Sequence, residues 1–173
     1  MTVLQIEAVE AKAGRSLISP DLFDRLSTRI THEHPEIDRP TAERIMDQAL
    51  AFLGACAVTT SPLSPSEKVD IGWHTFILYT KDYRQFCDRI AGRFIDHVPT
   101  DDHSDQQCQQ CSKCQDEKPP SVGAALNATF TALAVAEAGF IVDAPLWESG
   151  GACSQCKDGC HNDPPPNPDP KAI

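Results

Sequence analysis

The stretch from Lys68 to Pro99 concentrates aromatic, histidine and cysteine side chains in a chain of which only 6% is aromatic. Its first half places Val69, Trp73 and Phe76 at spacings of four and three residues, which is the repeat of one helical face. Its second half continues this repeat with Tyr83, Cys87, Ile90 and Phe94. We therefore predict two helices at the middle of the core, joined by a tight corner, with the second running to near His97.

Three further segments show the same helical spacing of apolar residues. Ser19-Pro20-Asp21 is a helix start, a polar cap followed by proline, and apolar residues then recur at every fourth position. Residues 45–56 carry a broad apolar stripe, and residues 120–140 form a last, alanine-rich segment. No stretch shows strand-like alternation of useful length. The predicted fold class is therefore all-α: an irregular bundle of about five helices with two Cys-rich loop arms and a Pro-rich C-terminal tail.

The chain length of 173 residues is that of a single domain, which can bury a core without disulfides. We assign residues 1–148 to one helical domain with an inserted Cys-rich loop at 100–119, because this loop has almost no apolar residues. We expect residues 141–160 to be loop-like. Residues 149–173 form a Cys-rich arm and a flexible tail, which is rich in proline.

The formal net charge of -10 argues against phosphate-backbone binding, because such binding needs Lys and Arg side chains to neutralise phosphates. We therefore expect no nucleic-acid partner. No run approaches the roughly 18 apolar residues of a membrane-spanning helix, and the first residues lack the basic and apolar regions of a signal peptide. These features predict a cytoplasmic protein without membrane contact, whose protein or small-molecule partner stays unknown.

Six of the eight cysteines lie in two tight clusters, Cys108/Cys111/Cys114 and Cys153/Cys156/Cys160. In a reducing compartment such clusters favour metal binding over disulfides. A two-residue gap lets two thiolates reach one ion, and Zn(II) accepts four such ligands in a tetrahedron. With His103 and His161 beside the clusters, the chain has more ligands than one zinc ion needs. Three alternatives stay open: one zinc with spare cysteines, a thiolate-rich site for two ions such as Cu(I), and metal-free reduced arms.

A second group of reactive side chains lies within the central stretch: Asp70, His74, Cys87 and His97. An aspartate four residues before a histidine shares its helix face and can orient the imidazole for metal ligation or proton transfer. Cys87 completes a site if the two helices pack antiparallel, and in one version it forms a nucleophilic pair with a histidine. The alternative is a core histidine with Asp70 as its hydrogen-bond partner.

The run from Val69 to His74, with Tyr83 and Cys87 beyond it, resembles the D-x-x-W-H-x-H-x-L…Y…C signature of the glycine-rich domain-containing protein-like family of plants, fungi and bacteria. The resemblance covers residues 40–99. Phe76 stands where the family often has a second histidine, and this chain, with 9 glycines, lacks the glycine-rich region. The family brings no defined activity, so the resemblance implies only candidate site residues: Asp70, Trp73, His74, Tyr83 and Cys87.

These patterns lead to three functional hypotheses, of which the first is preferred. It is a small cytoplasmic metal-binding helical protein that holds zinc in its two cysteine arms and has a structural or interaction role. The second is a metal-dependent or Cys/His enzyme that uses the group of Asp70, His74, Cys87 and His97. The third is a Cu(I) or zinc buffer or chaperone that uses the surplus thiolates.

Overall fold

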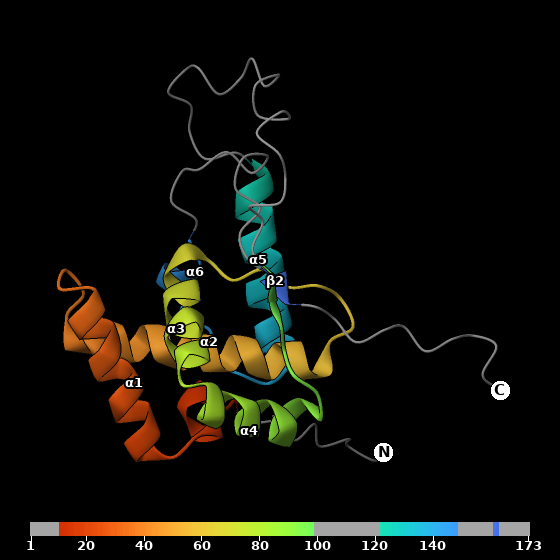
Figure 1. Ribbon diagram of the computed structural model, residues 1–173. Coiled ribbons are helices and arrows are strands. Elements are labelled where there is room, and N and C mark those ends of the chain that lie inside the picture. Colours follow the sequence, from red (N-terminus) through yellow and green to blue (C-terminus); the bar gives the residue numbers. More distant parts are fainter. Residues whose placement is uncertain (1–10, 99–121, 149–160, 163–173) are drawn as a thin grey trace, which may run out of the picture.

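The computed structural model describes residues 11–98, 122–148 and 161–162 (Figure 1). This part of the chain is an irregular bundle of helices, which confirms the predicted all-α class. Its elements in chain order are the 3₁₀ helix η1 (Gly14–Leu17), α1 (Pro20–Glu33), α2 (Arg39–Val58), α3 (Glu67–Leu78), α4 (Thr80–Ala91), β1 (His97–Val98), α5 (Val122–Glu137), α6 (Ala144–Trp147) and β2 (His161–Asn162). Within these ranges no helix meets the length and hydropathy that a bilayer-spanning helix requires.

Helix α2 is the central element of the bundle. It contacts η1, α1, α3, α4 and α5, and Figure 1 shows it crossing the middle of the molecule. Asp38 caps its start, because the carboxylate accepts a hydrogen bond of 2.9 Å from the Thr41 N–H. Residues 49–53 are all buried, so neighbouring elements cover this middle part of the helix on every side. A helix this enclosed determines where the others can pack.

Helix α3 approaches α2 closely at Gly72. A Cβ atom at this position would lie 2.6 Å from the Ala49 Cβ atom and 3.1 Å from the Ile45 carbonyl oxygen, so a side chain fits only if a helix moves. Ser66 caps the start of α3 by accepting a hydrogen bond of 3.2 Å from the Val69 N–H. The Ser66 cap therefore fixes where α3 begins, and the close contact at Gly72 fixes how near α3 lies to α2.

The corner between α3 and α4 is the single residue Tyr79, in agreement with the tight corner predicted from the sequence. The predicted end of α4 near His97 is wrong. The helix ends at Ala91, because Gly92 takes up a left-handed conformation (φ 65°) that stops it. Phe94, predicted on the buried face, is 42% exposed. The early end of α4 leaves His97 free to lie on a separate strand.

The last two helices of the described chain return to the first part of the bundle. Helix α5 contacts α2 and α6, and α6 contacts α3. The sequence predicts a helix over 120–140, whereas α5 ends at Glu137, before Gly139 with φ 83°. Helix α6 falls where a loop is predicted, because four residues are too few to show a helical period.

Two polar side chains of α2 hold this C-terminal region against the helix. The buried Gln48 side chain donates a hydrogen bond to the Ile141 carbonyl at 3.0 Å and accepts one from Trp147 Nε1 at 2.7 Å. Arg44 forms a bidentate ion pair with Asp143, with N···O distances of 2.6 and 2.8 Å. Because the apolar residues around these contacts join one hydrophobic cluster, residues 129–148 share the core of residues 11–98.

The two short strands β1 and β2 pair in antiparallel orientation. In this register His97 lies opposite Asn162, and Val98 lies opposite His161. A strand of two residues shows no alternation in the sequence, so neither was predicted. The pairing brings the chain just before the first cysteine cluster beside the chain just after the second.

Replacing Gly72 with alanine tests the close contact between α2 and α3. The added methyl group overpacks the interface, so we expect Gly72→Ala to lower the free energy of unfolding by about 1–3 kcal/mol in urea denaturation, despite the better helix propensity of alanine. In the double variant with Ala49→Gly the opposing methyl group is absent. Its loss of stability is therefore expected to be smaller than the sum of the two single losses. Strict additivity would contradict the contact.

Candidate metal centre

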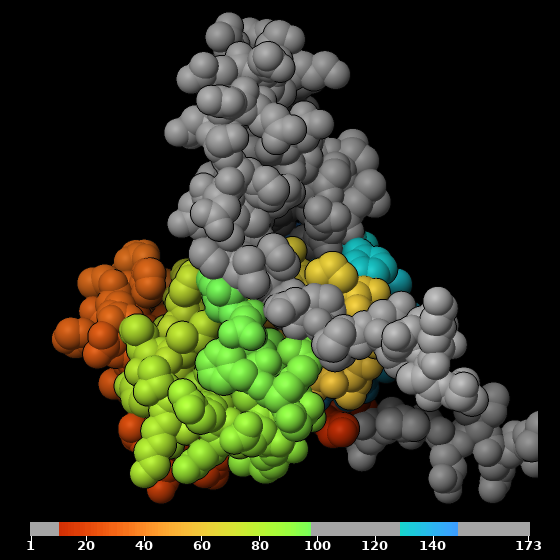
Figure 2. Space-filling model, turned by 45° about the vertical axis from the view of Figure 1, so that its right-hand side comes forward, coloured from red at the N-terminus to blue at the C-terminus, as the bar shows by residue number. Residues whose placement is uncertain are grey.

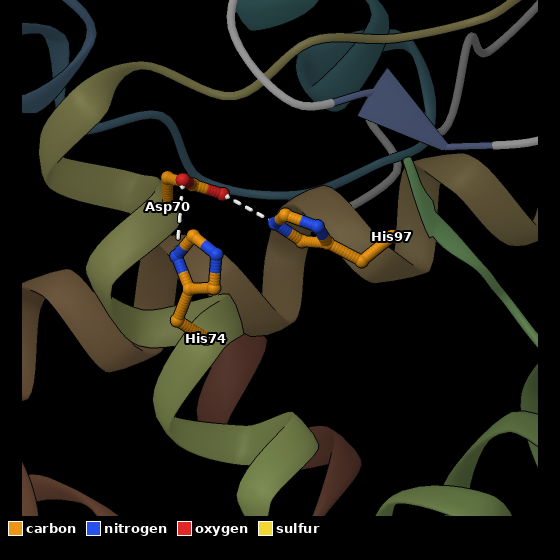
Figure 3. Close-up of side chains that lie close together, drawn as sticks. All are labelled: Asp70, His74 and His97. Carbon is orange, nitrogen blue, oxygen red and sulfur yellow. Dashed lines mark hydrogen bonds and ion pairs between the residues drawn. The ribbon is translucent and has the colours of Figure 1, made fainter. Parts of the chain in front are cut away.

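Asp70, His74 and His97 bring three side chains of metal-ligand type together (Figure 3). One ligand atom from each lies within 4.8 Å of the other two. The Asp70 carboxylate faces both imidazoles: its Oδ2 atom is 3.1 Å from His74 Nδ1, and its Oδ1 atom is 3.2 Å from His97 Nε2. In the part of the chain that the structure describes, this is the one such group of three or more His, Cys, Asp or Glu side chains.

Helix α3 supplies two members of the group. Asp70 and His74 are four residues apart and therefore lie on the same helix face. Asp70 is in the first turn of α3, where the unpaired backbone N–H groups and the helix dipole favour a negative charge. Its side chain is 18% exposed, whereas that of His74 is 56% exposed. The carboxylate is thus held at the surface of the core, and the histidine faces solvent.

His97 reaches the group from strand β1. Its side chain is only 11% exposed. The Trp73 ring packs against its imidazole with a centroid distance of 4.4 Å, and the His74 ring lies at 4.3 Å. Both neighbours come from α3, so this helix determines the surroundings of all three members of the group.

The two N···O distances of the group are near the distance between two ligands of one zinc ion. With Zn–N and Zn–O bonds of about 2.0–2.1 Å in a tetrahedron, two ligand atoms of one ion lie about 3.3 Å apart. Each imidazole nitrogen lies close to this distance from one of the two carboxylate oxygens, 3.1 Å from Oδ2 for His74 and 3.2 Å from Oδ1 for His97. Without a metal, each of these contacts needs a proton between the nitrogen and the carboxylate. A metal ion and protons therefore compete for the same atoms.

The elements that carry the group form one face of the molecule. Figure 2 shows α3, α4 and the segment leading to β1, coloured green, as a continuous surface. The His74 side chain, on α3, is 56% exposed. Solvent therefore reaches the group at His74.

Cys87 is not a member of this group, although the sequence analysis placed it with the other three residues. Its side chain is fully buried, and burial raises the pKa of its thiol more than hydrogen bonding with the Ile95 backbone and with Tyr83 lowers it. Burial also raises the pKa of Cys56, which lies in the core. A nucleophilic cysteine needs a lowered pKa and access to its substrate. Both thiols therefore have the properties of core residues.

The predicted cysteine ligands lie outside the described residues: Cys108, Cys111, Cys114, Cys153, Cys156 and Cys160. The seventh predicted ligand of this set, His161, is described through its backbone on β2, opposite Val98. A zinc site in the two cysteine clusters therefore stays a prediction.

Residues 15–115, more than half of the chain, match the model of the UCP032817-like family. The chain belongs to the UCP032817-like family. The UCP032817-like match runs from before α1 to beyond β1, so it includes the three residues of the candidate centre and the first cysteine cluster. No curated protein and no solved structure matches the chain significantly. Because the family description names no activity, the function has to be inferred from the site.

The burial of Cys56 and Cys87 predicts that both thiols resist alkylation in the folded protein. The thiolate is the reactive form, and the raised pKa of each buried group keeps it protonated. We expect N-ethylmaleimide at neutral pH to leave the peptides that contain these residues unmodified, and to label both in guanidinium chloride, as measured by mass spectrometry. Rapid labelling of Cys87 in the native protein would contradict its assignment to the core.

Proposed function

We propose that this protein binds a divalent transition-metal ion, preferably Zn(II), between Asp70, His74 and His97. The observation that carries the proposal is the approach of three ligand atoms to within 4.8 Å of one another. Two come from a helix and the third from a strand, so folding alone brings them together. Two imidazoles and one carboxylate are a donor set that transition-metal sites use.

The chemistry of the donors favours zinc and its neighbours over Mg²⁺ and Ca²⁺. Imidazole nitrogen suits Zn(II), Fe(II) and Co(II), whereas Mg²⁺ and Ca²⁺ prefer oxygen ligands alone. The formal net charge of -10 adds a general attraction for cations. We therefore expect Zn(II) or Co(II) to bind and Mg²⁺ to bind far more weakly.

Three protein ligands leave a coordination position for water or a small molecule. Structural zinc sites use four protein ligands, whereas catalytic sites use three and keep one position open. A metal ion held here would supply Lewis-acid chemistry and a bound water of lowered pKa. We therefore propose a centre of the catalytic type in a cytoplasmic protein. Its partner is a small molecule that approaches from the exposed side of His74.

The proposal predicts that His97→Ala and Asp70→Asn each weaken the binding of one metal ion per chain. In every sample the six cluster cysteines are replaced by serine, so that only this centre is measured. We expect the parent to bind one Co(II) ion, with a visible absorption spectrum typical of nitrogen and oxygen ligands. Both variants lose a ligand and are expected to bind Co(II) more than about 10-fold more weakly.

The matched control for this titration is His32→Ala. His32 is an exposed histidine on α1 and lies outside the group. Its removal is expected to leave Co(II) binding unchanged, which separates loss of the centre from loss of any surface imidazole. A folded parent that binds no Co(II), or equal affinity in the parent and in His97→Ala, would contradict the proposal.

The pairing of β1 with β2 favours a second metal site in the two cysteine clusters. Val98 and His161 lie opposite each other. Cys160 directly precedes His161, and Cys108 follows Val98 by about ten residues, which span at most about 36 Å. The two segments that carry the clusters therefore start from adjacent points. We propose that the clusters together hold one structural Zn(II), with Cu(I) as the alternative occupant and a structural or interaction role.

Cys111→Ser and Cys156→Ser test this second site, one in each cluster, with the Asp70/His74/His97 group left intact. Each variant is expected to lose the thiolate-to-metal absorption of bound Co(II) and to free thiols that zinc protects in the parent. Ser112→Ala, which changes a neighbour between two cluster cysteines, is the matched control. Unchanged zinc content and unchanged thiol protection would contradict the site. Several copper ions per chain would favour the metal buffer instead.

We also propose kinship with the glycine-rich domain-containing protein-like family, which the D-x-x-W-H…Y…C residues of this chain support. Asp70 and His74 of that signature are two of the three proposed ligands. Its other residues, Trp73, Tyr83 and Cys87, are fully buried.

A further inference from the structure

We propose that Tyr83, together with Trp73, positions His97 for metal binding. This inference rests on the proposed metal centre and adds residues that act on it without contacting the ion. Neither residue belongs to the ligand group, and both side chains are fully buried. They come from α4 and α3, the two helices that precede the segment carrying His97.

A chain of two hydrogen bonds runs from α3 through α4 to this segment. Trp73 Nε1 donates to the Tyr83 hydroxyl at 2.9 Å, and the Tyr83 hydroxyl donates to the Ile95 carbonyl at 2.7 Å. Burial raises the pKa of Tyr83, so its hydroxyl keeps the proton that it donates. The Cys87 thiol lies beside Tyr83 and the Ile95 backbone. The backbone two residues before His97 is therefore held by side chains of α3 and α4.

The same Trp73 side chain acts on His97 a second time, through its ring. The indole packs against the imidazole with a centroid distance of 4.4 Å and an interplanar angle of 57°. The Trp73 side chain thus contacts the His97 ring and, through Tyr83, holds the backbone that leads to His97. Both effects restrict where His97 Nε2 can lie relative to the Asp70 carboxylate.

The Tyr83 hydroxyl can be removed without removing the ring that fills the core. The ring makes edge-to-face contacts with Phe76 and Phe94, at centroid distances of 5.2 and 5.3 Å. Tyr83→Phe keeps these contacts and breaks both hydrogen bonds. Tyr79→Phe is the matched control, because Tyr79 is the other tyrosine of the chain and takes no part in this hydrogen-bond chain.

The test combines metal affinity with a measurement on the metal-free protein. With the six cluster cysteines replaced by serine, Tyr83→Phe is expected to bind Co(II) about 10-fold more weakly and with an altered visible spectrum, and Tyr79→Phe to match the parent. In the His97→Ala background Tyr83→Phe is expected to have no further effect on Co(II) affinity, because the imidazole that Tyr83 positions is absent. In metal-free Tyr83→Phe, the ring ¹⁵N chemical shifts of His97 are expected to change more than those of His74.

Unchanged Co(II) affinity and unchanged His97 shifts in folded Tyr83→Phe would overturn the inference. Equal loss of affinity in the presence and absence of His97 would also overturn it, because the effect would then be a general loss of stability. Trp73→Phe removes the indole N–H that donates to the Tyr83 hydroxyl. This variant replaces Tyr83→Phe in the test if Tyr83→Phe does not fold. A parent that binds no Co(II) would refute the metal proposal alone, and the His97 shifts would still decide the positioning role.

Discussion

The contact between α2 and α3 at Gly72 determines the position of the candidate centre. Residues 49–53 of α2 are all buried, and α3 approaches this helix to a distance at which a Cβ atom on Gly72 would lie 2.6 Å from the Ala49 Cβ atom. Because α3 carries Asp70 and His74 as well as the Trp73 ring against His97, a shift of this one helix would move the whole centre. The glycine thus connects core packing with the chemistry at the surface.

The Asp70 carboxylate gives the centre its chemical character. Its two oxygens face two imidazoles, at 3.1 and 3.2 Å, and so occupy the distances expected both for hydrogen bonds and for two ligands of one zinc ion. The atoms that form these contacts are the same atoms that the proposed ion would bind. Of the D-x-x-W-H…Y…C residues, Asp70 and His74 belong to this group, whereas Trp73, Tyr83 and Cys87 are fully buried.

Helical spacing predicted the bundle, the corner at Tyr79 and the relation of Asp70 to His74, because each depends on residues close in the sequence. The end of α4 was missed, since the apolar repeat continues past Gly92 whereas the backbone conformation of this glycine stops the helix. The sequence analysis also grouped Cys87 with the histidines, on the assumption that the two central helices pack antiparallel. Its position depends on how α4 packs, and the sequence contains no period that reports this packing. Strands β1 and β2 are set by a contact between distant segments, which a single sequence does not show.

The most direct measurement is anomalous diffraction at the zinc edge from crystals of the zinc-loaded protein. It locates the ion without relying on variants, and a bound ion identifies its own ligands. We expect a peak about 2.0–2.2 Å from an Asp70 carboxylate oxygen, His74 Nδ1 and His97 Nε2. Zinc bound elsewhere in the chain, with no peak between these three side chains, would contradict the central claim.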